Sequence, residues 1–327
     1  MSPLDRFHDR AAARAAALPP DAAFAWLDAH GLLALRRQPA LGAGLRRRLD
    51  AAARRNLAAN LWAIHRFGEV VDALGDLDVC PLKGIHLLDT VYRDDPGERR
   101  LGDLDLLVRR RDVEAAVARL EALGLVELPG SRRTAAFWPE RVLGDGRLAV
   151  ELHTRLGIKH GARSSWQEVA PVAGELHGRR VWLLDRETTL VHLVAHQVKH
   201  GPFVELRWAE DVLRWAAAGV DGKAALARAR RLGAARTLVA GVRALRAAAG
   251  DDLLPGVPAT LPGAAGRAIG WNERRVWRLD AGDPFAAGER STPLARNLSA
   301  LLLADRPADA ARFLLAKARE LGARAGG

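Results

Sequence analysis

The heptapeptide GDLDLLV, residues 102–108, decides how the rest of this chain is interpreted. Its apolar residues predict a β-strand, in which successive side chains point to opposite faces. Asp103 and Asp105 then share one face, whereas Leu104 and Leu106 point the other way, into a core. Two neighbouring carboxylates in an apolar strand repel each other and resist burial, so a positive partner is expected between them. A hard cation such as Mg²⁺, which prefers oxygen ligands, meets this need.

A third carboxylate lies in a second strand-like segment further along the chain. Glu151 alternates with apolar residues in VELH, residues 150–153, and His153 falls on the same face as Glu151. Three carboxylates on neighbouring strands are typical of two-metal sites, which activate a hydroxyl and stabilise charge on a phosphorus being transferred. An edge strand whose acids face solvent, or pair with arginines, is the alternative. His153 is a candidate for a contact with phosphate or for a hydrogen bond to one of the metal-binding carboxylates.

A Lys-Gly pair separates a strand-like run from a helical one just before this region. Glycine lets the backbone approach a phosphate closely, and a helix N-terminus offers unpaired N–H groups. Lys83 and Gly84 stand at such a junction, where Lys83 would add a cation. A plain tight turn is the alternative interpretation of the pair.

Helical spacing of apolar residues dominates both ends of the chain, and strand-like runs lie in the middle. Helices are expected over residues 11–18, 21–30, 44–74, 85–92, 112–123, 185–200, 204–218 and 222–249, and strands over 77–82, 104–108, 134–141, 147–153 and 180–184. Asp112 and Asp185 are candidate N-caps. The glycines around Asp145 predict a hairpin turn between two of the strands.

This order of elements predicts an α+β fold with a small mixed sheet flanked by helices. Prolines and glycines over residues 250–263 indicate a linker. The expected organisation is an N-terminal helical segment (1–75), an α/β core (76–185), a helical segment forming a cleft wall (186–250) and a C-terminal helical segment (264–327).

The positive charge of the chain is weak evidence for a nucleic-acid partner. The formal charge is +11, but only five of the 50 basic residues are lysines. Abundant arginine and alanine are typical of a GC-rich coding bias, so a solvated basic surface explains the charge more simply than a nucleic-acid face. Aromatic residues make up 5% of the chain, which is poor material for a stacking platform. The single cysteine, Cys80, excludes an internal disulfide and a cysteine-based zinc site.

A cytoplasmic location without a membrane partner is expected. No apolar run reaches the roughly eighteen residues that a transmembrane helix needs. The N-terminal residues 1–10, MSPLDRFHDR, carry acids and lack the apolar stretch of a secretory signal.

Four sequence blocks occur in an order that resembles a known family. They are PLKGIHLLDTVY (81–92), ERRLGDLDLLV (98–108), AVELHTRL (149–156) and HLVAHQVKHGPFVELRWAEDV (192–212). Together they resemble a bacterial family of uncharacterised nucleotidyltransferases within the polymerase-β-like superfamily, over roughly residues 55–215.

The resemblance implies a nucleoside triphosphate such as ATP as donor, with Mg²⁺ or Mn²⁺ as the metal. It implies metal-binding and catalytic roles for Asp103, Asp105 and Glu151. Lys83, Gly84 and Arg99 would hold the triphosphate, because Arg99 matches an arginine that the family places four residues before its first aspartate. The chain departs from the superfamily at the glycine turn, where the residue after Gly84 is an isoleucine and no serine is available for phosphate.

Three histidines in the last block recur every four residues and so share one helix face. They are His192, His196 and His200. Internal packing, a contact with substrate or phosphate, and zinc binding are the possible roles, although spacing indicates no acidic partner for zinc. By resemblance His196, His200, Trp208 and Asp211 belong near the core or the cleft. We expect these helices to pack across the acidic face, to bring His196 or His200 within reach of the cleft, and to face an acceptor.

The main hypothesis is a metal-dependent enzyme that moves a nucleoside monophosphate from a nucleoside triphosphate to a hydroxyl or other nucleophile and releases pyrophosphate. The acceptor can be a small molecule, a peptide or protein, or RNA. The alternatives are kinase-like transfer of the γ-phosphoryl group, a non-catalytic nucleotide-binding regulatory module, and an RNA-directed transferase. RNA binding would show a steep salt dependence.

Overall fold

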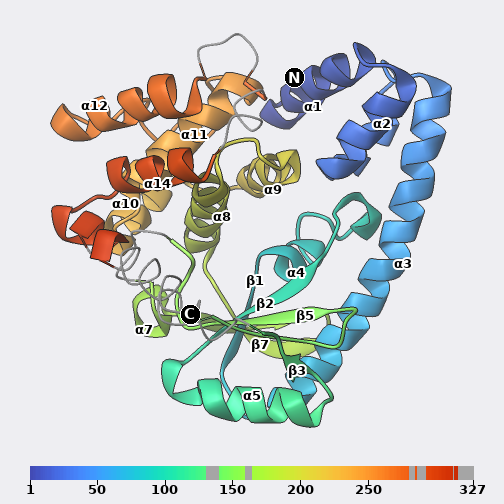
Figure 1. The fold of residues 1–327 in the computed structure, drawn as a ribbon, viewed down its shortest axis with the longest axis vertical. Coiled ribbons are helices and arrows are strands. Elements are labelled where there is room, and N and C mark those ends of the chain that lie inside the picture. The colour runs from blue at the N-terminus through green and yellow to red at the C-terminus, as the bar shows by residue number, and fades with distance from the viewer. Residues whose placement is uncertain (130–139, 159–163, 280–283, 286–291, 312, 316–327) are drawn as a thin grey trace.

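The structure is a computed structural model that describes residues 1–129, 140–158, 164–279, 284–285, 292–311 and 313–315. A mixed sheet lies at one end of the molecule, and helices from both ends of the chain lie over it (Figure 1). The predicted α+β class is confirmed. Within the described ranges, none of the helices combines the length and the apolar character that crossing a bilayer requires.

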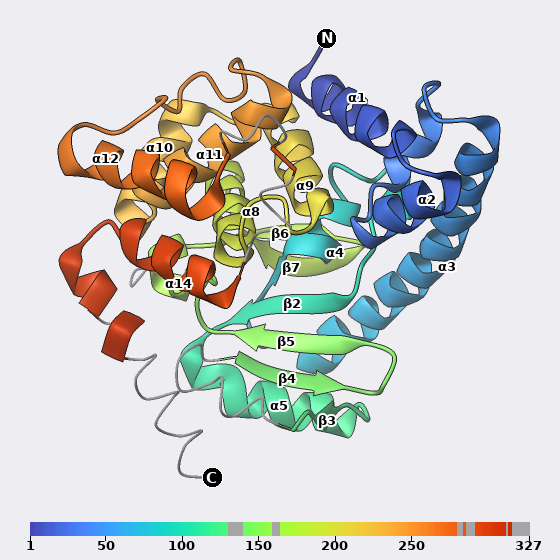
Figure 2. The ribbon, with the colours of Figure 1, turned by 45° about the horizontal axis from the view of Figure 1, so that its top comes forward.

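The sheet has five strands in the order β1-β2-β5-β4-β3, which Figure 2 shows in part. They are β1 (Val79–Leu82), β2 (Asp103–Val108), β5 (Ala149–His153), β4 (Glu140–Gly144) and β3 (Val126–Glu127). The strands β2 and β5 run parallel, and the other neighbours are antiparallel. In the parallel pair Asp105 stands opposite Glu151, so the two predicted acidic strands are adjacent.

One face of this sheet is covered by apolar packing. Leu104 and Leu106 are fully buried, as the alternation predicted. They belong to a core cluster with Phe67 from α3 (Ala43–Leu74) and Leu120 from α5 (Val113–Ala122). The side chains that alternate with Leu104 and Leu106 along the strand point to the opposite face of the sheet, toward α4 (Lys83–Leu88) and α8 (Arg186–His200).

The remaining helices form a second core above the sheet. They are α1 (Pro3–Ala16), α2 (Pro20–Ala29), α9 (Leu206–Ala217), α10 (Gly222–Leu232), α11 (Ala235–Ala249), α12 (Gly263–Trp271) and α14 (Pro293–Leu302), with the π-helical turn η4 (Asn272–Trp277). Short helices are η1 (Leu33–Arg37), η2 (Pro96–Glu98), η3 (Arg110–Asp112) and α7 (Trp166–Val169). Helix α1 packs on α9 and α11, so the start of the chain shares this core with its second half.

Several local expectations differ from the structure. The helix expected over 222–249 is two helices, because Gly233 ends α10 in the left-handed conformation with φ 74°. The strand expected over 180–184 is β7 (Arg179–Leu183), which pairs with the unexpected β6 (Val172–Leu176) in a hairpin. Strand β3 was also not expected. Residues 134–139 of another expected strand lie outside the described ranges, and β4 begins at Glu140.

The two candidate N-caps behave differently. Asp185 accepts a hydrogen bond from the backbone N–H of Thr188 at 2.6 Å and begins α8, which confirms the expectation. Asp112 stands at the first position before α5, but its side chain makes no capping hydrogen bond.

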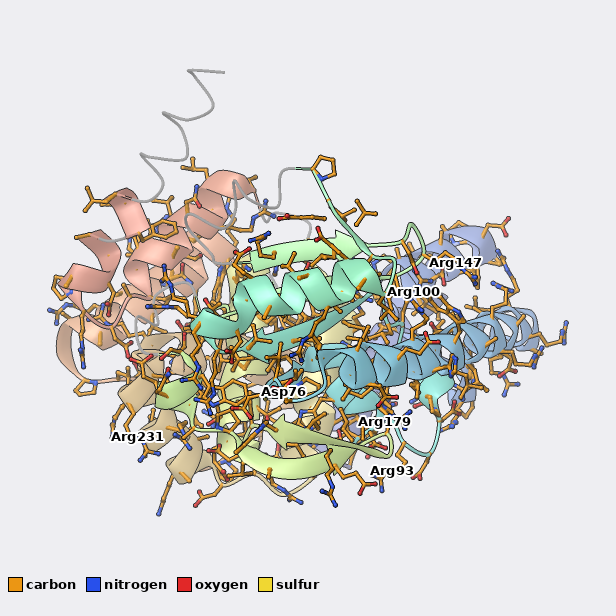
Figure 3. The ribbon with its side chains drawn as sticks, turned by 90° about the horizontal axis from the view of Figure 1, so that it is seen from below. Asp76, Arg93, Arg100, Arg147, Arg179 and Arg231 are labelled. Atoms are coloured by element: carbon orange, nitrogen blue, oxygen red, sulfur yellow. The ribbon has the colours of Figure 1, made fainter. Side chains whose placement is uncertain are left out.

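The arginine-rich surface is distributed over several elements. Figure 3 labels five arginines, which come from separate segments and are spread over the view from below. They are Arg93, Arg100, Arg147, Arg179 and Arg231. Some pair locally, as Arg179 does with Asp72 at 2.8 Å. This spread agrees with a solvated basic surface.

Candidate active site

Three potential metal-ligating side chains meet where β2 and β5 lie side by side. The Nε2 atom of His153 lies 2.9 Å from Oδ1 of Asp105 and 3.3 Å from Oε2 of Glu151. One ligand atom from each of the three residues lies within 4.8 Å of the others. This grouping follows from the parallel register, because Asp105 and Glu151 are cross-strand neighbours and His153 follows two residues later on the same face.

A lysine neutralises the buried member of the cluster. Lys83 Nζ lies 2.5 Å from Oδ1 of Asp105, whose side chain is 2% exposed. Burial alone would raise the pKa of Asp105, but the attraction of Lys83 and the hydrogen bond with His153 hold that pKa well below its usual range. Asp105 is therefore ionised, and its positive partner in this structure is Lys83.

Asp103 lacks such a partner. Among the described residues, no side chain forms a hydrogen bond or an ion pair with its carboxylate. Burial, reinforced by repulsion from Asp105, raises the pKa of Asp103 from its ordinary value of 3.8 to about 6. Asp103, Asp105 and Glu151 thus place three carboxylates near the ammonium of Lys83, and the group whose ligand atoms lie within 4.8 Å of one another is Asp105, Glu151 and His153. The carboxylate oxygens fit a divalent cation such as Mg²⁺.

The Lys-Gly junction has an unexpected backbone geometry. Lys83, with φ 48°, adopts the left-handed conformation, whereas Gly84 does not. A glycine is required at position 84 for space, because a Cβ there would lie 2.4 Å from Leu101 Cδ1 and 2.5 Å from Arg99 Nη1. The turn therefore brings the chain of α4 directly against the segment that precedes β2.

Gly84→Ala is expected to weaken nucleotide binding and to destabilise the fold by about 1–3 kcal/mol, the usual range for overpacking. Leu101 can rotate away, but Arg99 is fixed by its partners and must shift. Chemical denaturation and titration with a nucleoside triphosphate would measure both effects. Gly44→Ala, on α3, is the control for glycine replacement without crowding, because nothing lies within 4 Å of its added Cβ and, like Gly84, it is not in the left-handed conformation.

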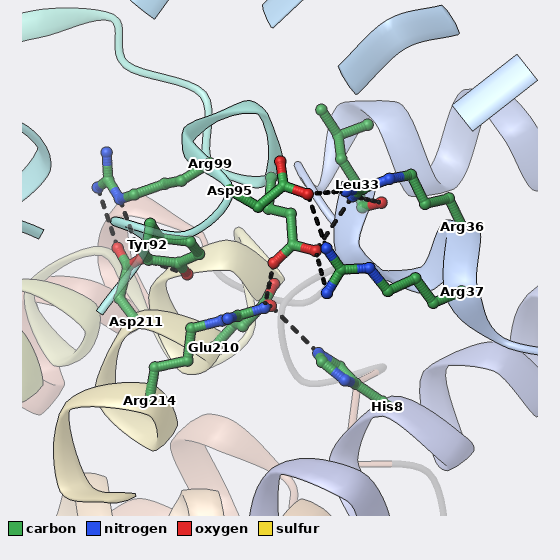
Figure 4. Close-up of polar contacts among 11 residues, drawn as sticks. His8, Leu33, Arg36, Arg37, Tyr92, Asp95, Arg99, Glu210, Asp211 and Arg214 are labelled. Atoms are coloured by element: carbon green, nitrogen blue, oxygen red, sulfur yellow. Dashed lines mark hydrogen bonds and ion pairs between the residues drawn. The ribbon is translucent and has the colours of Figure 1, made fainter. Parts of the chain in front are cut away.

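Arg99 is held in place by a residue of α9. Its Nε and Nη2 atoms donate to the two carboxylate oxygens of Asp211, each at 3.0 Å. Tyr92 donates its hydroxyl to the same carboxylate at 2.9 Å. Figure 4 shows this group beside a second set of ion pairs, in which Arg214 contacts Glu210 and Glu98. The sequence left the partner of Asp211 open, and the structure identifies it as Arg99.

The carboxylates open into a cavity of about 390 Å³ between the sheet and the helices α8 and α9. Every residue expected at the site lines it, namely Lys83, Gly84, Arg99, Asp103, Asp105, Glu151, His153, His196 and His200. Helices α8 and α9 contribute lining residues to this cavity, among them His196 and His200, as expected of a cleft wall. His192 is buried one turn earlier, and its ring nitrogens have no hydrogen-bond partner among the described residues.

Further lining residues were not identified from the sequence. They include Arg100, Gly102, Gly157, Leu193, Lys199, Glu205 and Arg207. Several flank residues that were identified, since Arg100 follows Arg99 and Lys199 precedes His200. Side chains in loops and at helix ends carry no periodic signal, so their positions depend on how α8 and α9 pack.

The comparisons with known proteins agree with this geometry. A family model described as uncharacterised nucleotidyltransferase matches residues 20–250, which is well over half of the chain. No curated protein and no solved structure matches. The matched range contains the sheet, the carboxylates, the Lys-Gly turn and the helices α8 and α9. The chain therefore belongs to this nucleotidyltransferase family and is a transferase enzyme.

Proposed function

We propose that the protein transfers a nucleoside monophosphate from a nucleoside triphosphate to a hydroxyl or other nucleophile, with Mg²⁺ or Mn²⁺ as cofactor. The observation that carries this proposal is the unpaired carboxylate of Asp103 beside Asp105 and Glu151 in one cavity. Paired oxygen donors with uncompensated charge are what metal-dependent phosphoryl and nucleotidyl transfer requires.

The three carboxylates would hold the metal. Asp103 and Asp105 come from β2, and Glu151 comes from the adjacent strand, so a rigid sheet supports all three. When bound, the metal would stabilise negative charge on the phosphorus and increase the acidity of the attacking hydroxyl. His153 contacts both Asp105 and Glu151 and would orient their oxygens.

Lys83, Gly84 and Arg99 would bind the triphosphate. Lys83 would provide a cation beside the carboxylates, and Gly84 leaves room for the guanidinium of Arg99 beside the turn. A guanidinium has five N–H donors. Asp211 takes two of those of Arg99 and the Arg100 carbonyl takes one, so the others are available for phosphate oxygens.

In the proposed reaction, the acceptor oxygen forms a bond with the α-phosphorus while the bond from that phosphorus to the bridging oxygen breaks. Pyrophosphate leaves with the electrons of the broken bond. The proton of the acceptor would pass to Glu151, whose side chain is 27% exposed and so is the carboxylate most open to an acceptor in the Asp105–Glu151–His153 group.

Incubation of the protein with a cell extract and nucleoside triphosphates labelled at the α- or γ-phosphorus tests this proposal. With Mg²⁺ or Mn²⁺ we expect the α-label to appear in a product and pyrophosphate to be released, and EDTA to abolish both. Transfer of the γ-label with release of a nucleoside diphosphate would instead indicate a kinase. Metal-dependent nucleotide binding without transfer of either label would favour a regulatory module.

A further inference from the structure

Three aromatic rings gather on the wall of the cavity that faces the carboxylates. His196 and His200 come from α8, and Trp208 comes from the start of α9. Their ring centroids are 4.8 Å apart for the two histidines and 4.9 Å from each histidine to the indole. All three residues line the cavity. Although Phe, Trp and Tyr make up only 5% of the chain, a tryptophan joins two histidines in one cluster here.

The cluster offers an aromatic surface to the cavity. Each of the three side chains is only partly buried, so the rings contribute to the cavity wall. Burial, followed by the nearby Lys83 charge, holds the pKa of His196 well below its usual range, and its imidazole is therefore neutral. Lys199 and Arg207 line the same cavity.

The size of the cavity favours one ligand that reaches both walls. Its volume of about 390 Å³ lies at the lower end of the roughly 300–1,000 Å³ that small-molecule sites occupy. In the proposed function Lys83, Gly84 and Arg99 hold the phosphates beside the metal-binding carboxylates of the sheet. The same molecule must then place its base against other lining residues, and the rings of α8 and α9 provide the aromatic part of that lining.

We propose that the base of the nucleoside triphosphate stacks on the ring cluster of His196, His200 and Trp208. This inference rests on the proposed function, and it assigns recognition of the nucleoside triphosphate to the wall formed by α8 and α9. It also revises the expectation from the sequence that this wall faces the acceptor. A base offers a flat π-surface, and stacking on an aromatic side chain stabilises a complex without requiring a particular base.

Replacement of Trp208 by alanine and by phenylalanine tests the base subsite. In the presence of Mg²⁺, Trp208→Ala is expected to weaken binding of ATP, GTP, CTP or UTP by about 5- to 150-fold. Binding of inorganic tripolyphosphate, which has no base, should not change. Trp208→Phe keeps a ring and should retain most of the affinity. Trp271→Ala is the matched control, because Trp271 is 46% exposed on α12.

Tryptophan fluorescence gives a second measurement that does not depend on a stable alanine variant. Nucleoside triphosphates should quench wild-type fluorescence more than tripolyphosphate does, and Trp208→Phe should remove the difference. Equal loss of affinity for triphosphates with and without a base would overturn the proposal. So would an unchanged donor affinity with a raised KM for the acceptor, which would assign the wall to the acceptor. Absence of metal-dependent nucleotide binding in the wild-type protein would refute the proposed function as well.

Discussion

Replacement of Asp103 by asparagine is expected to lower turnover by about a thousandfold or more while leaving the protein at least as stable as the wild type in metal-free buffer. The loss of turnover follows because an amide cannot supply the charge with which the carboxylate would hold the metal, and transition-state electrostatics of this kind contribute several kcal/mol. The stability follows because Asp103 has no ionic partner among the described residues.

The stability effect has a defined pH dependence. The pKa of Asp103 is raised to about 6 in the folded protein, above its ordinary value of 3.8, so ionisation of this group destabilises the fold. At 1.36 kcal/mol per pKa unit, Asp103→Asn can raise the free energy of unfolding by at most about 3 kcal/mol above pH 6. The gain should disappear below about pH 4, where the carboxyl is protonated in both states. Thermal melting in EDTA across this pH range measures it.

A surface aspartate provides the control for the asparagine substitution itself. Asp76, labelled in Figure 3, is 84% exposed and pairs with Arg119, and it is not among the residues that line the cavity. Asp76→Asn should leave turnover unchanged. Near-wild-type turnover in Asp103→Asn would contradict the metal-binding role, and a lower melting temperature in EDTA would show that the carboxylate has a structural partner.

Much of the fold could be predicted because the decisive elements are local. The alternation in residues 102–108 determined both the strand and the buried Leu104 and Leu106, and Asp185 marked the start of α8. Two of the expectations that failed have identifiable causes. Gly233 is a typical helix end that the apolar periodicity concealed. Strand β3 has two residues, too few for any pattern, and depends on pairing with β4.

Some contacts of the candidate site could likewise be predicted from the sequence, and others could not. Asp105 and Glu151 could be placed together because alternation and strand adjacency fix their faces. The hydrogen bonds between Arg99 and Asp211 could not be predicted, since they join residues that are far apart in the chain and depend on where α9 lies relative to the segment before β2. Its consequence is functional: the arginine expected to hold phosphate uses part of its donor capacity to anchor itself to α9.

Asp105→Asn is expected to abolish turnover as Asp103→Asn does, but it should also destabilise the fold by about 3 kcal/mol. Removing one partner of a buried ion pair typically costs about 3–5 kcal/mol, because the other charge stays buried. Lys83 is 15% exposed and would lose its contact with Asp105. Asp103 and Glu151 still attract the ammonium, which places the expected loss at the lower end of the range.

The double variant Lys83→Met/Asp105→Asn separates stability from catalysis. Methionine fills a similar volume without a charge, so the double variant should recover most of the stability that Asp105→Asn loses. Its turnover should remain abolished, because it lacks both a metal carboxylate and the cation expected to hold the triphosphate. Urea denaturation of the wild type, both single variants and the double variant gives the coupling energy between the two side chains. A coupling energy near zero would mean that Lys83 reaches solvent in solution, and the lysine would then be free to bind phosphate without first leaving Asp105.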